Sequence, residues 1–206
     1  MIVDGGNFDY SATDRYPEFL VPDESYHGLV YASLGKNAFG VKCRVQMMRD
    51  LGAIMSPENA FLTNLGMETL SLRMERHSEN AKKVAAFLAN HEKVEWVKHP
   101  SLESDPYYAL AGKYLPRGMG GMMSFGVKGG SEKAAAFMEG LKMIRIVTHV
   151  ADVRSCVLHP ASTTHRQLSS AALAAIGIAD NLIRLSVGIE SAEDIIADIE
   201  AALNTI

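Results

Sequence analysis

The segment from Ser56 to His91 constrains the fold of this chain more than any other. Ser56 and Pro57 supply a helix N-cap and a first-turn proline, and Gly66 is the only helix breaker that follows before His91. Apolar residues gather at both ends of the segment, whereas its middle, RMERHSENAKK, is strongly polar. This pattern is typical of a helix that bridges two packed regions. The sequence therefore predicts one long bridging helix over residues 57–91.

Strand-like and helical stretches alternate after this segment. The strand-like stretches are rich in β-formers or apolar residues and are bounded by Pro or Gly; they are VEWVKHP (94–100), GMMSFGVKGG (121–130), RIVTHV (145–150), SCVLH (155–159) and LIRLSVGIE (182–190). Helices are expected over 38–51, 131–141 and 167–175, and after Ser191, which is a favourable N-cap followed by two acids. The order predicts an α/β (α+β, two-layer) fold with helices packed on one sheet.

The first 35 residues differ in composition from the rest of the chain. They are rich in Gly, Pro, Tyr and Asp, and only Ile2 and Val3 form an apolar opening before the Gly5-Gly6 turn. We interpret residues 1–35 as a connecting arm and residues 36–206 as a domain.

Composition excludes several classes of protein. Twenty basic and 24 acidic residues give a net charge of −4 without a dense Lys/Arg cluster, which disfavours nucleic-acid binding. The longest weakly charged apolar stretch, residues 170–183, is too short to span a membrane, and the N-terminus does not resemble a secretory signal. We therefore expect no membrane partner, a cytoplasmic location, and reduced Cys43 and Cys156.

The stretch RSCVLHPASTTH (154–165) contains three side chains that could bind zinc, namely Cys156, His159 and His165. Cys156 and His159 are an odd number of residues apart, so they face opposite sides of a straight strand, and a fourth ligand is missing. The same geometry argues against a Cys/His nucleophile pair. We therefore predict no metal site and a buried core cysteine.

Two short matches to acyl-transfer or phosphate-binding motifs are incomplete. Ser33 and Lys36 match the start of penicillin-recognising enzymes, but neither Ser-Asp-Asn nor Lys-Thr-Gly occurs in the chain. The Gly118–Gly121 loop lacks a phosphate-binding pattern.

Arg184 is the strongest candidate binding residue. It lies in an apolar strand-like run, where a guanidinium needs an anionic partner. That partner is either a ligand carboxylate or an internal acid such as Asp152 or Glu190, and the pattern of residues alone leaves both open.

Four segments carry a family resemblance: VKCRVQMMRDLGAIMSPENAFL, GMETLSLRMERHSENAKKVAAFL, LHPASTTH and IRLSVGIE. Together they resemble the C-terminal half of the pyridoxal-phosphate enzymes of Cys/Met metabolism, and the O-acetylhomoserine sulfhydrylases are the most similar branch. The resemblance implies the small domain of fold-type I enzymes, with a mainly antiparallel sheet. It leaves cystathionine γ-synthase and methionine γ-lyase activities, or a noncatalytic assembly module, as alternatives.

The resemblance also implies which parts of the enzyme this sequence contains. None of its ten lysines lies in the Ser-x-Thr-Lys context that holds pyridoxal phosphate as a Schiff base in the family, so the chain is expected to be inactive alone and not to bind the cofactor. Residues 1–35 then resemble the edge of a missing N-terminal cofactor-binding domain. The expected partners are that domain, an amino-acid substrate and further copies in a homotetramer.

By resemblance, Arg184 matches the arginine that grips the substrate α-carboxylate. His149 falls where relatives carry Ser or Asn beside that carboxylate, and either substrate binding or simple packing fits it. Ser155, His159 and Thr164 are expected to support the pocket through hydrogen bonds without taking part in catalysis.

Overall fold

The computed structural model describes residues 3–206, and its contacts divide the chain into two compact units, Met1–Asn64 and Leu65–Ile206. This division differs from the boundary expected at residue 35. Residues 36–64 group with the N-terminal segment because Phe19, Tyr31 and Ala38 share a small hydrophobic core. The boundary falls inside helix α3 (Pro57–Glu68).

The N-terminal unit consists of short helical turns and one longer helical run. The 3-10 turns are η1 (Tyr10–Ala12), η2 (Pro17–Phe19), η3 (Glu24–Tyr26) and η4 (Tyr31–Asn37). The run is α1 (Ala38–Lys42), the π-helical η5 (Cys43–Met48) and α2 (Arg49–Leu51), followed by Gly52 at φ +64°. The helix predicted over 38–51, with a glycine stop, is confirmed.

The helix predicted over 57–91 is interrupted. It consists of α3 and α4 (Leu70–Ala89), with Thr69 in a non-helical conformation between them (φ −107°, ψ 7°). The Arg73 guanidinium donates hydrogen bonds across the break to the Gly66 carbonyl (2.5 Å) and to Thr69 Oγ1 (3.4 Å). The two helices cover most of the predicted range, but the prediction of one continuous helix does not hold at Thr69. The Ser56 cap is confirmed, since its Oγ accepts from the Asn59 N–H.

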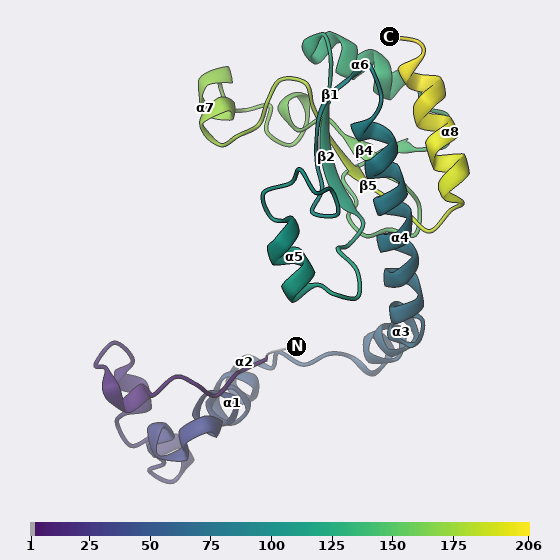
Figure 1. The fold of residues 1–206 in the computed structure, drawn as a ribbon. Coiled ribbons are helices and arrows are strands. Elements are labelled where there is room, and N and C mark those ends of the chain that lie inside the picture. Colours follow the sequence, from purple (N-terminus) through teal and green to yellow (C-terminus); the bar gives the residue numbers. More distant parts are fainter. Residues whose placement is uncertain (1–2) are drawn as a thin grey trace. The chain divides into compact units, whose positions relative to one another are not determined.

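The C-terminal unit is built on a five-stranded sheet (Figure 1). Its strands are β1 (Val94–Lys98), β2 (Met122–Val127), β3 (Arg145–Ile146), β4 (Cys156–Leu158) and β5 (Leu182–Ser186), in the order β1-β2-β5-β4-β3. Every pairing is antiparallel except that of β3 with β4. The mainly antiparallel α/β fold is confirmed.

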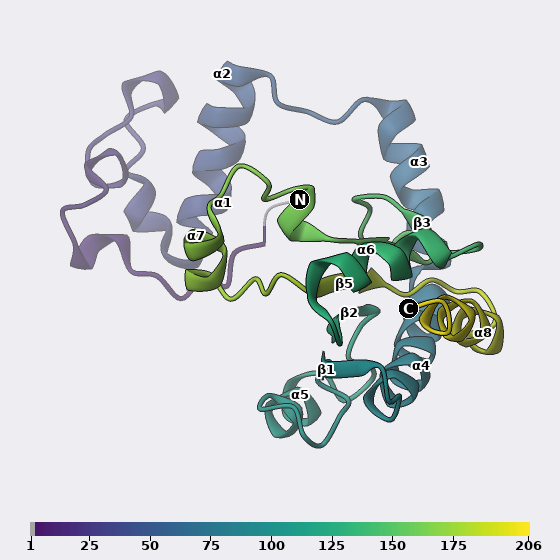
Figure 2. The same cartoon turned by 90° about the horizontal axis from the view of Figure 1, so that it is seen from above.

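Three helices cover one face of this sheet. They are α4, α6 (Gly130–Gly140) and α8 (Ala192–Leu203), and Figures 1 and 2 show α4 and α8 side by side. Phe125 on β2 and Ile183 and Leu185 on β5 point into the core with them, and Phe125 meets Phe137 of α6 edge-on at 5.6 Å. Because side chains alternate along a strand, Arg184 lies on the opposite face. Two short helices, α5 (Tyr108–Tyr114) and α7 (Ser170–Ala175), and the turn η6 (Pro160–Ser162) complete the unit.

Within residues 3–206, no helix combines the length and the apolar character that a membrane crossing requires.

A buried carboxylate fixes the approach to β3. Asp198 on α8 is 9% exposed, and its oxygens accept hydrogen bonds from the backbone N–H groups of Lys142, Met143 and Ile144 at 2.9, 3.1 and 2.9 Å. A charged acceptor makes such bonds stronger than neutral ones.

Replacing Asp198 by Asn should lower the free energy of unfolding by about 2 kcal/mol, because an amide offers one acceptor and adds donors that face N–H groups. Urea denaturation measures the change. Asp194→Asn is the matched control on the same helix, where the side chain is exposed and only about 0.5 kcal/mol is expected. Equal losses in both variants would contradict the role given to Asp198.

Candidate functional site

Arg184 lies near the centre of the sheet face that is turned away from α4, α6 and α8. On β5 it is in register with Ser124 of β2 and Leu158 of β4, and it is half-buried. Its Nη2 donates to the carbonyl oxygens of Thr148 (3.0 Å) and His149 (3.3 Å), in the segment between β3 and β4. These two carbonyls hold one edge of the guanidinium and are neutral.

No acid neutralises Arg184 within residues 3–206. The two acids considered from the sequence, Asp152 and Glu190, are bonded elsewhere, and neither forms an ion pair with Arg184 within 4.0 Å. A guanidinium carries five N–H donors, and the two bonds of Arg184 both use Nη2. The internal salt bridge is therefore not found, and donors remain for an anionic ligand.

Asp152 is bound by its own neighbours. Its carboxylate accepts from Arg154 Nε and Nη2 (both 3.2 Å) and from the Arg154 N–H (3.0 Å), and Nδ1 of His149 lies 3.1 Å from Oδ2. The hydrogen bonds from Arg154 hold the pKa of Asp152 well below its usual range, so the carboxylate stays ionised. The His149 side chain is 55% exposed, and Asp152 sets the orientation of its ring.

Glu190 and Ser155 brace the other end of the same segment. Glu190 accepts from the Ser155 N–H (2.6 Å) and from the Ser155 hydroxyl (3.0 Å), and the Ser155 Oγ accepts from the Gly188 N–H (2.9 Å). A Cβ at Gly188 would overlap the Glu190 carboxylate and the backbone at Val153 and Ser155, so only glycine fits there. Ser155 is buried, and its hydroxyl both donates and accepts a hydrogen bond.

His159 and Thr164 have different environments. His159 is buried, and its two ring nitrogens meet Ser162 Oγ (2.8 Å) and the Asp180 carbonyl (2.7 Å). Thr164 is exposed, and its hydroxyl meets the ring of His165 at 2.9 Å. The neighbouring Thr163 is the threonine that ties the loop to the His159 carbonyl, at 2.7 Å.

The side chains considered for zinc binding have separate partners. Cys156 is buried and its thiol donates to the His149 carbonyl at 3.3 Å, and burial raises its pKa. His159 bonds to Ser162 and the Asp180 carbonyl, and His165 bonds to Thr164. Across residues 3–206 the structure contains no group of three or more His, Cys, Asp or Glu side chains that could hold a metal ion.

Reasoning from the sequence missed the carbonyls that hold Arg184. Thr148 and His149 contribute backbone oxygens, which carry no residue-type signal. The strand order does carry a signal for these carbonyls. Because β4 lies next to β5 in the sheet, the segment just before β4 is brought close to the centre of β5.

The chain matches a known family over most of its length. The model described as Cys/Met metabolism PLP-dependent enzyme matches residues 26–204. The O-acetyl-L-homoserine sulfhydrylase of Corynebacterium glutamicum is 47% identical over 210 residues, which is 100% of this chain and 48% of the relative. The chain therefore belongs to the Cys/Met metabolism PLP-dependent enzyme family, and it spans about half the length of the curated relatives that it matches.

Two solved structures are similar in fold. One is described as an O-acetylhomoserine (thiol)-lyase from Campylobacter jejuni with pyridoxyl-lysine monophosphate; it has a TM-score of 0.83 and 40% identity, over 93% of this chain and 46% of that one. The other is the O-acetylhomoserine sulfhydrylase of Wolinella succinogenes, with a TM-score of 0.77 and 33% identity, over 97% of this chain and 50% of that one.

The lining of the small cavity beside His149 offers no amine for the aldehyde of pyridoxal phosphate. No lysine lines the small cavity beside His149, which is bounded by Arg145, Arg154 and Cys156 among others. The one buried lysine within residues 3–206 is Lys42, and it lies in the N-terminal unit and donates to a backbone carbonyl. The donors around Arg184 suit a carboxylate.

Replacing Ser155 by Ala should lower the free energy of unfolding by about 1–3 kcal/mol, because the Gly188 N–H loses its buried acceptor. Thr164→Ala removes an exposed hydroxyl and should change the same quantity by less than about 0.5 kcal/mol. Thermal or urea unfolding of both variants checks this. A larger loss for Thr164→Ala would reverse the assignment of the supporting hydroxyl.

Acid titration should find Asp152 ionised below the usual aspartate range. Its stabilising contribution should be complete above the unfolded-state pKa and disappear as the pH falls through the lowered folded-state value. Carbon-13 NMR of the side-chain carboxyl follows the titration, and Arg154→Met should move the midpoint upward. An unchanged midpoint in that variant would show that Arg154 is not the cause.

Proposed function

We propose that this chain is the part of a PLP-dependent O-acetylhomoserine sulfhydrylase that binds the substrate α-carboxylate through Arg184. The observation that carries the proposal is a half-buried guanidinium without an acid partner among the described residues, held by two carbonyls on the sheet face opposite the three helices. The family membership and the sulfhydrylase relatives support the reaction class.

Arg184 would bind the carboxylate of O-acetylhomoserine with its remaining N–H donors. A planar guanidinium makes two parallel bonds to a carboxylate, which fixes orientation as well as affinity. The Thr148 and His149 carbonyls restrict rotation of the side chain, so less freedom is lost when the substrate binds. The segment that carries these carbonyls would thereby help to orient the substrate.

His149 would contact the substrate from the rim of the same site. Its ring is exposed and oriented by Asp152, and its backbone carbonyl already contacts Arg184. A ring nitrogen not bonded to Asp152 is available to a ligand.

The cofactor chemistry would come from residues outside this sequence. Bound pyridoxal phosphate supplies an electron sink for substrate carbanions, and this chain offers no lysine in the required context. We therefore expect the chain to be inactive alone and to act with a cofactor-binding domain in a cytoplasmic homotetrameric enzyme. Cystathionine γ-synthase or methionine γ-lyase activity is the alternative, because the thiol acceptor is not determined by the groups around Arg184.

A fusion tests the proposal. The half of the Corynebacterium glutamicum relative that this chain does not match, expected from the resemblance to be the N-terminal half, is joined in frame before it. Homocysteine formation from O-acetylhomoserine and sulfide is then measured. Arg184→Lys should raise KM about 10- to 100-fold, because a fork of charge-assisted bonds is replaced by a single ammonium.

Arg166→Lys is the control, since Arg166 is exposed and makes no side-chain bond within the described residues. It should leave KM unchanged. An active fusion with the same KM in both variants would refute a role of Arg184 in carboxylate binding. Activity of the unfused chain with added cofactor would refute its expected inactivity.

A further inference from the structure

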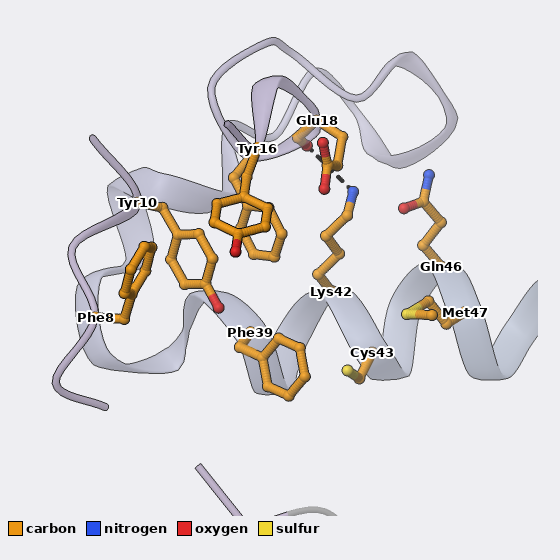
Figure 3. Close-up of a pocket in the computed structure, with 10 residues that line it drawn as sticks. Phe8, Tyr10, Tyr16, Glu18, Phe39, Lys42, Cys43, Gln46 and Met47 are labelled. Carbon is orange, nitrogen blue, oxygen red and sulfur yellow. Dashed lines mark hydrogen bonds between the residues drawn. The ribbon is translucent and has the colours of Figure 1, made fainter. Parts of the chain in front are cut away.

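A second candidate binding site lies within the N-terminal unit. A cavity of about 640 Å³ opens between the segment of residues 8–19 and the helical run that begins at Ala38 (Figure 3). Its volume is in the range of small-molecule sites. Tyr and Phe residues gather among the first 35 positions of the chain, but their spacing alone does not predict a cavity.

Aromatic rings form one wall of the cavity. Tyr10 is stacked on Phe19 with ring centroids 3.9 Å apart, and Phe8 packs edge-on against Tyr10 at 4.8 Å. Phe39 adds a further ring from the helical run (Figure 3). Burial raises the pKa of Tyr10, so its hydroxyl remains a neutral hydrogen-bond donor. This wall suits an apolar or aromatic group.

Lys42 places a buried ammonium beside these rings. It is 7% exposed, its Nζ donates to the Glu18 carbonyl at 3.1 Å, and it lies 4.5 Å from the Tyr31 ring centroid and 5.2 Å from that of Phe19. An ammonium has three N–H donors, and the two rings compensate its burial only in part. Within residues 3–206 it forms no ion pair within 4.0 Å.

The nearby acids do not neutralise Lys42 by contact. Glu18 lines the cavity, but it is an exposed residue, so water screens the charge of its carboxylate. Asp23 accepts from the Tyr31 hydroxyl at 2.5 Å and from the Ser25 hydroxyl at 2.6 Å. The buried charge of Lys42 therefore favours an anion in the cavity.

We propose that this cavity binds a small organic acid, with its carboxylate on Lys42 and its apolar body against Phe8, Tyr10 and Phe39. This site uses none of the residues around Arg184 and does not depend on the function proposed for them. It would give the N-terminal unit a ligand of its own, distinct in residues from the amino-acid substrate.

The test compares 3-phenylpropionate with its neutral amide on the intact 206-residue chain. Isothermal titration should give one site, with the acid binding about tenfold more tightly than the amide, because a charge-assisted bond exceeds a neutral one. Proton–nitrogen NMR should place the shifts at Tyr10, Phe39 and Lys42. Equal affinity of acid and amide, no binding at millimolar concentration, or shifts confined to other residues would overturn the proposal.

Matched variants separate charge from packing. Lys42→Met keeps an apolar stem and should abolish the preference for the acid, whereas Lys42→Arg keeps the charge and should retain it. Glu18→Gln removes the acid that lines the cavity and should strengthen binding of the acid about two- to threefold. If circular dichroism shows that Lys42→Met is unfolded, the affinities of Glu18→Gln and Lys42→Arg for the acid and the amide test the proposal instead. Loss of the preference for the acid over the amide in Glu18→Gln would overturn it.

Discussion

The alternation of side chains along β5 determines the chemistry of the C-terminal unit. Ile183 and Leu185 must face the helices to close the core, so Arg184 between them has to leave on the opposite face. A charge at that position needs compensation, and the structure provides neutral carbonyls from Thr148 and His149. Core packing and the position of Arg184 are thus set by the same strand register, and a slip of one residue would bury the guanidinium and expose the core.

The segment between β3 and β4 has to be rigid for those carbonyls to hold Arg184. Two carboxylates hold the backbone on either side of it: the buried Asp198 on α8 fixes residues 142–144 before β3, and the half-buried Glu190 after β5 fixes Ser155 before β4. The Ser186 hydroxyl accepts from the N–H of Ala151, a non-glycine residue at φ +57°. A strained conformation of this kind persists where surrounding bonds determine it. The acidic side chains of this region therefore accept hydrogen bonds from the backbone, and none of them pairs with Arg184.

Periodicity predicted the elements whose side chains pack against the core. The sheet strands follow from short apolar runs bounded by Pro or Gly, and α6 and α8 follow from 3.6-residue spacing and from the Ser191 cap. Three features could not be predicted in this way. The helix is interrupted at Thr69, where Arg73 bonds locally to Gly66 and Thr69. The helix α5 is short and mostly exposed, and residues 36–64 join the first unit through packing around Tyr31. At the site, Arg184 was identifiable by its residue type in an apolar run and Ser155 only through the family resemblance, whereas the backbone acceptors and the exposure of Thr164 depend on the folded path.

Arg184 and Lys42 illustrate how a cation inside a protein can remain available for an anionic ligand. A cation paired with a buried carboxylate gains little from a second anion, because the local charge is already neutral and the acid repels the ligand. A cation held by carbonyl oxygens or aromatic rings keeps its charge, since those groups contribute dipoles and quadrupoles. The rigid fork of Arg184 suits a carboxylate in one fixed orientation, whereas the rotatable ammonium of Lys42 tolerates several. Strict positioning is what a reaction requires, and tolerance suits reversible binding of varied acids, so the two cations favour different uses.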